Sequence, residues 1–241
     1  MSVPPAPRPL KAVVLAAGHD QATRDLLLRP LAGSVPRSAR QDPQSARPSE
    51  QAPSALTSIG STVIEQTLAN VTAVVPQSDV IVVVAEHDHS VREHLGEGWT
   101  YVVQTTQAGT GDAVRCARFQ LAGFTGDVLI AYGDTPLLRA ASLRGLLWRH
   151  RLKAAQFSLL TAVLTDGDGY GRIQRDHGRI VGIVEDTDLS ESSERITEVN
   201  VGAYVVDNAI LIPGLDAMAA SGEHRLTELA RRLIGQGGTL A

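Results

Sequence analysis

Three runs of the chain are apolar almost from end to end, at residues 10–17 (LKAVVLAA), 79–86 (DVIVVVAE) and 126–134 (GDVLIAYGD). Continuous apolar runs are typical of strands that are buried on both faces of a parallel sheet. Stretches with a helical pattern of apolar residues follow them, at residues 61–74, 111–122 and 140–155. This alternation predicts an α/β fold built on a doubly wound, mostly parallel sheet.

Further strands are predicted at residues 99–104, 156–165 and 198–207. Two short strand patterns, 171–176 and 179–186, are separated by the dipeptide His177-Gly178, which favours a hairpin turn. We therefore expect an antiparallel addition to the parallel sheet in this part of the chain. A glycine-flanked helical pattern closes the sequence at residues 222–238.

The length suits one large α/β domain or two small ones, and the composition predicts a cytoplasmic protein. The chain has 241 residues, 43% of them hydrophobic, which is enough for a core, and its formal net charge of −4 gives no sign of a nucleic-acid or membrane surface. The single cysteine excludes an internal disulfide and fits a reducing compartment, and no apolar run approaches transmembrane length. Residues 34–54 are rich in proline, serine, arginine and glutamine, so we expect a mobile insertion there.

The first strand leads into a loop that begins like a phosphate-binding loop. The small residues of Leu15-Ala16-Ala17-Gly18 allow a ligand to approach the backbone closely. A phosphate loop normally continues with more glycine and a nearby lysine, but here His19 to Arg24 follow, and Lys11 and Lys153 are the only lysines of the sequence. The sequence is therefore compatible with an unusual nucleotide loop or with a loop that has lost its chemistry.

Asp134 comes directly after the buried strand that ends in Tyr132-Gly133. Ligands of open α/β sheets bind beyond the carboxyl ends of the strands, and Mg²⁺ takes one or two carboxylates together with phosphate oxygens. This position favours a magnesium ligand, although an aspartate that only caps the following turn fits the same residues.

Two other stretches carry polar side chains that suit ligand binding. Gln104 precedes Gly109-Thr110-Gly111, which opens a helix whose first amides favour an anion or a base carbonyl. An amide such as that of Gln104 can pair with the edge of a nucleobase. Further on, Glu185 and Asn200 suit the recognition of hydroxyl and N-acetyl groups. Each of these signals is weak when taken alone.

Together and in order, the motifs LAAG, Q-x-x-Q-x-GTGDA, YGDTPLL, GYGRI-x-RD, IVE-x-TD and I-x-EVN-x-GAY resemble a known family. It is the uridyltransferase domain of bacterial N-acetylglucosamine-1-phosphate uridyltransferase, and the resemblance runs from about Ala12 to Thr227. The resemblance implies a Rossmann-like nucleotidyltransferase fold over residues 1–241, Mg²⁺ as cofactor, and a small-molecule nucleotide and a sugar phosphate as ligands.

The resemblance also implies a role for individual residues. Arg24 is implied as the catalytic arginine and Asp134 as the metal ligand. The implied nucleotide-binding residues are Leu15, Ala16, Ala17, Gly18, Gln104, Gly109 and Thr110. The implied sugar-binding residues are Tyr132, Gly133, Gly171, Glu185, Asn200 and Thr227.

The sequence departs from the family in its cationic loop and near its end. Two extra residues precede Thr23-Arg24, and Ser54 stands where the family has a lysine. The chain reaches Ala241 before the motif that supplies a second magnesium ligand, and before any β-helix acetyltransferase domain. Two interpretations remain open: an enzyme that makes UDP-N-acetylglucosamine and releases pyrophosphate, or a homologue that binds a nucleotide sugar or a partner without turnover. Another base or sugar is also compatible with the motifs.

Overall fold

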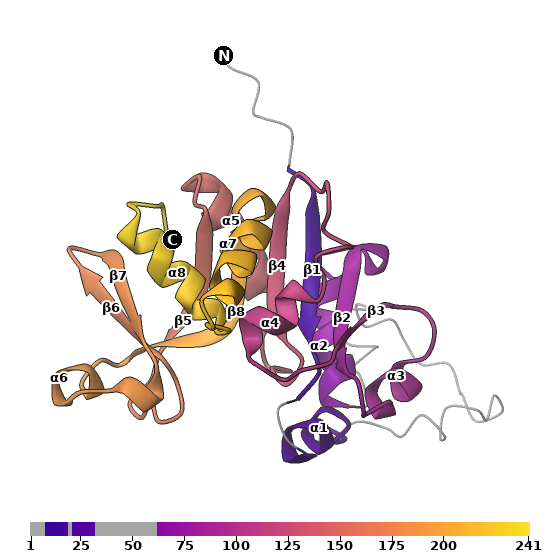
Figure 1. Ribbon diagram of the computed structural model, residues 1–241. Helices are drawn as coiled ribbons and strands as arrows, with labels where there is room; N and C mark the ends of the chain where they lie inside the picture. The colour runs from indigo at the N-terminus through magenta and orange to yellow at the C-terminus, as the bar shows by residue number, and fades with distance from the viewer. Residues whose placement is uncertain (1–7, 19–20, 32–61) are drawn as a thin grey trace, which may run out of the picture.

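The computed structural model describes residues 8–18, 21–31 and 62–241. Within these ranges eight strands form one sheet (Figure 1). The strands are β1 (Leu10–Leu15), β2 (Val80–Ala85), β3 (Thr100–Gln104), β4 (Asp127–Tyr132), β5 (Phe157–Val163), β6 (Arg172–Asp176), β7 (Arg179–Val184) and β8 (Glu198–Asp207). The α-helices are α1 (Gln21–Leu27), α2 (Val63–Thr72), α3 (Ser90–Leu95), α4 (Thr110–Arg115), α5 (Ala140–Leu152), α6 (Glu191–Glu194), α7 (Asn208–Ala220) and α8 (Leu226–Gly235).

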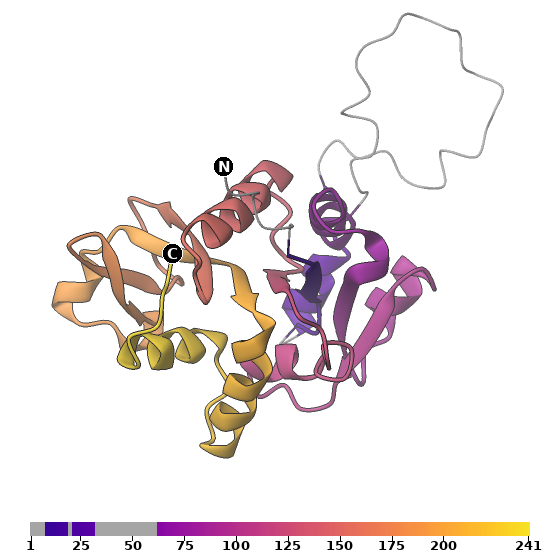
Figure 2. The ribbon, with the colours of Figure 1, turned by 90° about the horizontal axis from the view of Figure 1, so that it is seen from above.

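The sheet has a parallel part and an antiparallel part. Strands β3, β2, β1 and β4 lie side by side and are all parallel. Strand β8 pairs antiparallel with both β4 and β5, and β6 continues the sheet from β8 to β7. The β6–β7 hairpin therefore lies on the far side of the molecule from β2 and β3 (Figure 2). The predicted α/β fold with an antiparallel addition is confirmed.

The hairpin turn has the geometry that its two residues predict. His177 and Gly178 join β6 to β7 with φ angles of 46° and 81°. Two consecutive positive φ angles are the mark of a type I′ turn, whose twist matches that of the flanking strands. The short dipeptide thus determines where the antiparallel addition reverses direction.

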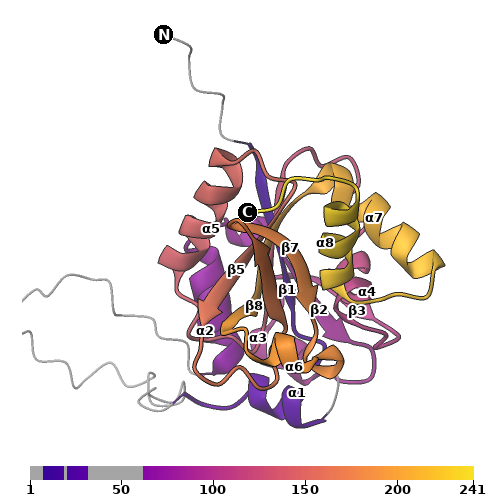
Figure 3. The ribbon, with the colours of Figure 1, turned by 90° about the vertical axis from the view of Figure 1, so that its left-hand side faces the viewer.

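Helices cover both faces of the sheet (Figure 3). On one face Val14 and Leu129 pack with Ile64 of α2 and Leu143 of α5. On the other face Val13 and Ile130 pack with side chains of α4, α7 and α8, namely Val114, Leu215 and Leu229. Since neighbouring residues of a strand face opposite sides, both faces need apolar residues, which explains the continuous apolar runs.

Several segments differ from the sequence-based expectations. Helices α1, α6 and α7 were not predicted: α1 and α6 are short, and α7 contains Pro213 within a sequence that has little polar character. The predicted helix at 111–122 ends as a regular helix at Arg115 and continues in turns. The expected insertion at residues 34–54 lies outside the described residues. No helix in the described part of the chain has the length and apolar character needed to cross a bilayer.

Candidate active site

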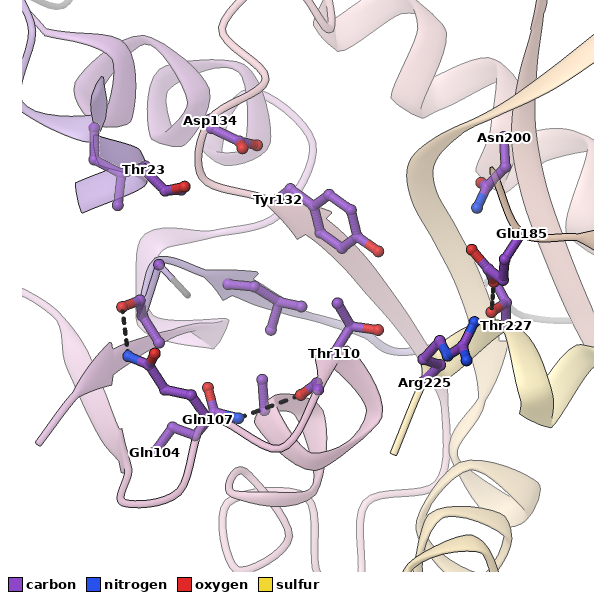
Figure 4. Close-up of a pocket in the computed structure, with 16 residues that line it drawn as sticks. Thr23, Gln104, Gln107, Thr110, Tyr132, Asp134, Glu185, Asn200, Arg225 and Thr227 are labelled. Carbon is purple, nitrogen blue, oxygen red and sulfur yellow. Dashed lines mark hydrogen bonds between the residues drawn. The ribbon is translucent and has the colours of Figure 1, made fainter. Parts of the chain in front are cut away.

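A cavity of about 450 Å³ opens at the carboxyl ends of the parallel strands. The last residues of β1, β3 and β4, which are Leu15, Gln104 and Tyr132, all contribute to its wall. The antiparallel addition and α8 close the opposite side (Figure 4). The predicted site residues that line it are Leu15, Ala17, Gly18, Gln104, Gly109, Thr110, Tyr132, Asp134, Glu185, Asn200 and Thr227.

Three predicted residues whose side chains the structure describes do not line the cavity, and a fourth cannot be placed. Ala16 is buried and packs on the α2 side of the sheet. Gly133 donates its N–H to the Leu15 carbonyl, and a Cβ there would lie 2.9 Å from Ile64, so this glycine serves close packing behind the wall. The Gly171 carbonyl accepts a hydrogen bond from the Asn200 N–H and so helps to hold the backbone of that residue in place. Arg24 lies on α1, and its side chain is outside what the structure describes.

The Gln104 amide is buried and held in one orientation at the end of the cavity formed by β3 and the loop before α4, which we name the base end after the nucleobase that the sequence resemblance predicts there. Its Nε2 donates to the Gly109 carbonyl at 3.2 Å and to the Asp112 carboxylate at 3.1 Å. Since a carboxylate only accepts, the amide nitrogen must face Asp112. Both N–H donors are thereby engaged within the protein, and the carbonyl oxygen is the atom of this amide that remains for a ligand.

The glycine-rich loop at the start of α4 contacts a backbone carbonyl of the chain itself, that of His224. The His224 carbonyl accepts from the N–H of Gly111 at 2.7 Å and from that of Asp112 at 3.3 Å. A Cβ at Gly109 or Gly111 would come within 2.6 Å or 2.8 Å of the His224 oxygen. The expectation that the first amides of this helix bind an anion is therefore corrected for these two amides, because a backbone carbonyl already occupies them.

Hydrogen-bonding groups run from Tyr132 to the end of the cavity formed by Glu185, Asn200 and Thr227, which we name the sugar end after the ligand that the sequence resemblance predicts there. The Asn200 amide donates to the Tyr204 hydroxyl at 2.8 Å, and the Tyr204 and Tyr132 hydroxyls are 3.5 Å apart. Thr110 lines the same cavity as Tyr132. Burial raises the pKa of Tyr132 and raises that of Tyr204 well above its ordinary value, so both phenols stay protonated at neutral pH.

The sugar end combines a carboxylate with hydroxyl and guanidinium groups. Thr227, in the first turn of α8, donates a hydrogen bond to the Glu185 carboxylate, which follows β7. Arg225 lies beside them, as Figure 4 shows, and is 3.6 Å from Asp188 and 3.9 Å from Glu223. These long ion pairs hold the half-exposed guanidinium at the cavity wall.

A family model described as nucleotidyl transferase matches residues 48–240. The chain belongs to the nucleotidyl transferase family. The bifunctional protein GlmU of Enterococcus faecalis is 38% identical over 186 residues, covering 76% of this chain and 40% of the relative. GlmU of an Exiguobacterium species is 40% identical over 153 residues, covering 62% of this chain and 34% of the relative. The chain thus spans less than half the length of these curated relatives.

Solved nucleotidyltransferases share the fold. A protein from Bacillus anthracis described as a glucose-1-phosphate thymidylyltransferase, in complex with sucrose, superposes with a TM-score of 0.65 at 16% identity, covering 97% of this chain and 85% of its own. A UDP-glucose pyrophosphorylase complexed with UDP-glucose gives a TM-score of 0.63 at 12% identity, with coverages of 94% and 87%. At these identities the likeness supports the Rossmann-like fold of this nucleotidyl transferase.

The predicted metal ligand lies on the cavity wall away from the sugar end. Figure 4 shows Asp134 and Thr23 on the side opposite to Glu185 and Asn200. Among the described residues there is no group of three or more His, Cys, Asp and Glu side chains that could hold a metal ion alone. A single carboxylate fits Mg²⁺ that phosphate oxygens also coordinate, which is how nucleotide enzymes commonly hold this ion.

Residues that the sequence interpretation did not single out also line the cavity of this nucleotidyl transferase. Gln107, Leu27, Ala113 and Arg225 belong to this group, and Thr23 had been noted only as a motif position. Gln107 is the second glutamine of the Q-x-x-Q motif, and its Nε2 lies 3.5 Å from the Ala17 carbonyl, so the motif itself contained a signal for it. Arg225 had no such signal, because a long-range contact brings α8 to the site.

Proposed function

We propose that the chain transfers a uridylyl group from UTP to N-acetylglucosamine 1-phosphate, giving UDP-N-acetylglucosamine and pyrophosphate, with Mg²⁺ as cofactor. One observation carries the proposal: a single cavity brings the predicted base residue Gln104, the predicted metal ligand Asp134 and the predicted sugar residues Glu185, Asn200 and Thr227 together. The one continuous sheet supports the further proposal that residues 1–241 act as one domain.

The base end favours uracil over cytosine. The Gln104 carbonyl oxygen can accept a hydrogen bond from the N3–H of uracil, whereas N3 of cytosine carries no hydrogen. Because Asp112 and Gly109 hold both amide hydrogens, the side chain cannot rotate to offer a donor without losing two hydrogen bonds. UTP should therefore bind more tightly than CTP.

The sugar end offers acceptors and donors for hydroxyl and N-acetyl groups. The Glu185 carboxylate would accept from sugar hydroxyls, while the Thr227 hydroxyl holds it in place. Tyr132, which stays protonated, lies between the two ends and can donate to the ligand or its phosphate. These contacts would position an oxygen of the sugar phosphate for attack on the α-phosphorus of UTP.

In the reaction, the attacking oxygen forms a bond to the α-phosphorus as the bond to the bridging oxygen of pyrophosphate breaks. No covalent enzyme intermediate is needed, so positioning and charge neutralisation provide the catalysis. Asp134 would hold the Mg²⁺, and the ion would neutralise charge on the phosphate oxygens.

The test is a pyrophosphate-release assay with UTP, N-acetylglucosamine 1-phosphate and Mg²⁺. Release should require all three components and should fall when CTP replaces UTP. Glu185→Ala should weaken sugar-phosphate binding by about 1–3 kcal/mol, because buried polar partners lose their acceptor, and should leave UTP binding unchanged. Glu97→Ala removes a carboxylate that is 90% exposed and serves as the control. Tight UTP binding without any response to the sugar phosphate would contradict the proposal.

A second candidate is a protein that binds the sugar nucleotide without turnover. Of the described residues that line the cavity, Arg225 is the only cationic one, and it lies at the sugar end. Transfer of a uridylyl group from UTP needs positive charge near the α-phosphate, and Ser54 stands where the family has a lysine. This candidate would be selected if calorimetry detects binding of UDP-N-acetylglucosamine while the assay detects no pyrophosphate release. Ser54→Lys should then raise UTP affinity or turnover.

A further inference from the structure

We propose that Thr110 is a positioning residue that orders the sugar end of the cavity through the first turn of α8. The proposal rests on the proposed function for the identity of the ligand at that end. Its structural part is independent of any ligand, because it concerns a contact between two helices that are far apart in the sequence.

Helices α4 and α8 each begin without a cap of their own. The residue before α8, Arg225, makes no side-chain capping hydrogen bond, and the residue before α4 is Gly109, which has no side chain. The first N–H groups of a helix have no partner within the helix and need one elsewhere. In this protein Thr110 of α4 supplies a partner for α8, and His224, in the loop just before α8, supplies one for α4.

The two contacts are reciprocal. The Thr110 hydroxyl oxygen accepts from the Leu226 N–H at 3.0 Å, as an N-cap side chain would. The His224 carbonyl in turn accepts from the N–H groups of Gly111 and Asp112. Leu226 is fully buried, so its N–H has no access to water as an alternative partner.

The contact matters for the cavity because of the residues on either side of Leu226. Arg225 precedes it and Thr227 follows it, and both line the sugar end. Thr227 is also the donor that holds the Glu185 carboxylate. A shift of the first turn of α8 therefore moves Arg225 and Thr227 and frees the Glu185 carboxylate from its hydrogen bond. Gln104, in contrast, keeps its own hydrogen bonds to Gly109 and Asp112.

The close fit of the two segments gives a second way to disturb them. A Cβ at Gly111 would lie 2.8 Å from the His224 oxygen, which is a backbone atom and cannot rotate away. Gly111→Ala should therefore push residues 224–226 from the loop while Thr110 keeps its hydroxyl. Gly145→Ala on α5 is the matched control, because a Cβ there meets nothing within 4 Å.

The experiment compares Thr110→Val, Thr110→Ser and Gly111→Ala with the wild-type chain. Hydrogen exchange measured by mass spectrometry on peptides covering residues 226–230 reports the contact directly, and kinetics report its effect. Thr110→Val should speed that exchange and raise the KM for N-acetylglucosamine 1-phosphate by about tenfold, a larger rise than it causes in the KM for UTP, since Thr110 also lines the cavity near the predicted base residues. Gly111→Ala should show the same pattern, and Thr110→Ser should restore wild-type values because it keeps the acceptor.

Unchanged exchange in Thr110→Val would overturn the proposal, and so would a rise in the KM for UTP alone. Faster exchange with unchanged sugar-phosphate affinity would also overturn it, because the contact would then hold α8 without ordering the sugar end. If the wild-type chain bound neither ligand, the proposed function would fail, and with it the assignment of a sugar end. The exchange data would still decide whether Thr110 caps α8.

Discussion

Two Gly-Asp pairs bracket strand β4, Gly126-Asp127 at its start and Gly133-Asp134 just after its end. Asp127 is fully buried: its carboxylate accepts from Arg151 at 2.8 Å and lies 3.3 Å from the Arg8 guanidinium. Asp134 lines the cavity. The same dipeptide thus serves the fold at one end of the strand and forms part of a ligand cavity at the other.

The difference follows from strand direction. Parallel strands present their carboxyl ends to the ligand side of the sheet, so a carboxylate at that end can meet phosphates and a metal ion. At the amino end, Asp127 already has cationic partners, which neutralise it and leave no reason for it to recruit a metal. Position in the sheet, more than residue type, separates the two roles.

Of the substitutions that separate the roles of Asp127 and Asp134, Asp134→Ala should produce the largest effect. We expect Mg²⁺-dependent pyrophosphate release to fall by about 10²–10³-fold, because one electrostatic stabiliser of the transferring phosphoryl group is lost. The urea midpoint should stay close to that of the wild-type chain. Asp176→Asn, at an exposed position near the hairpin turn, is the control. Mg²⁺ dependence that survives in Asp134→Ala would exclude this carboxylate as the metal ligand.

Asp127→Asn should have the opposite profile. The change keeps the size of the side chain but leaves Arg8 and Arg151 without their carboxylate, so we expect a loss of about 2–4 kcal/mol in the free energy of unfolding. Turnover per folded molecule should not change, because the cavity lies at the other end of β4. Urea unfolding and the release assay measure the two quantities, and a fall in turnover with stability intact would contradict the assignment.

The acid stability of the protein should depend on the same carboxylate. Burial alone would raise the pKa of Asp127, but the nearby His150 ring, whose Nε2 lies 3.6 Å from the carboxylate, the hydrogen bond from Arg151 and the charge of Arg8 together hold it below its ordinary value. A carboxyl group with a lowered pKa stabilises the fold above its unfolded pKa of about 3.9, and this contribution is lost as the pH falls through the folded pKa. The difference in stability between wild type and Asp127→Asn should therefore shrink below about pH 4. A difference that stays constant from neutral to acid pH would show that Asp127 acts through packing.

The sequence could predict the parallel part of the fold because a strand buried on both faces needs consecutive apolar residues. Val13 and Val14 are an example, since they face opposite cores. It could also select Asp134 over Asp127, because strand direction follows from the order of strands and helices. It could not find α7, whose apolar residues and Pro213 give no clear helical period.

Within the site, sequence motifs located the residues at the strand ends but not the contacts between distant segments. Gly111 was expected to leave its amide for a ligand anion, yet the His224 carbonyl takes it across more than a hundred residues. Arg225 was missed for the same reason, since its place at the cavity depends on how α8 packs. Local sequence patterns predict where strands end. Only the tertiary structure shows which residues from other segments contact those ends.

Substitution of Gly126 or Gly133, the glycines of the two pairs, should have a smaller effect that also differs between the two ends of β4. A Cβ at Gly126 would lie 2.4 Å from the Pro9 carbonyl oxygen and 2.5 Å from the Phe124 ring, so Gly126→Ala must move backbone at the start of β1. A Cβ at Gly133 would lie 2.9 Å from the Cδ1 of Ile64 and 3.0 Å from the Leu15 carbonyl, and the Ile64 tip can rotate away.

Gly133→Ala should therefore cost about 1–2 kcal/mol in the free energy of unfolding, which is less than Gly126→Ala. It should nevertheless be the one of the two that lowers turnover, because Leu15 and Leu27, which surround this glycine, also line the cavity. Urea unfolding of both variants, with the release assay run on the folded protein, tests the pair. Gly145→Ala supplies the baseline, since alanine in an open helical site should stabilise the chain by about 0.4–1 kcal/mol. If Gly126→Ala lowered turnover as much as Gly133→Ala does, the two ends of β4 would not be functionally separate.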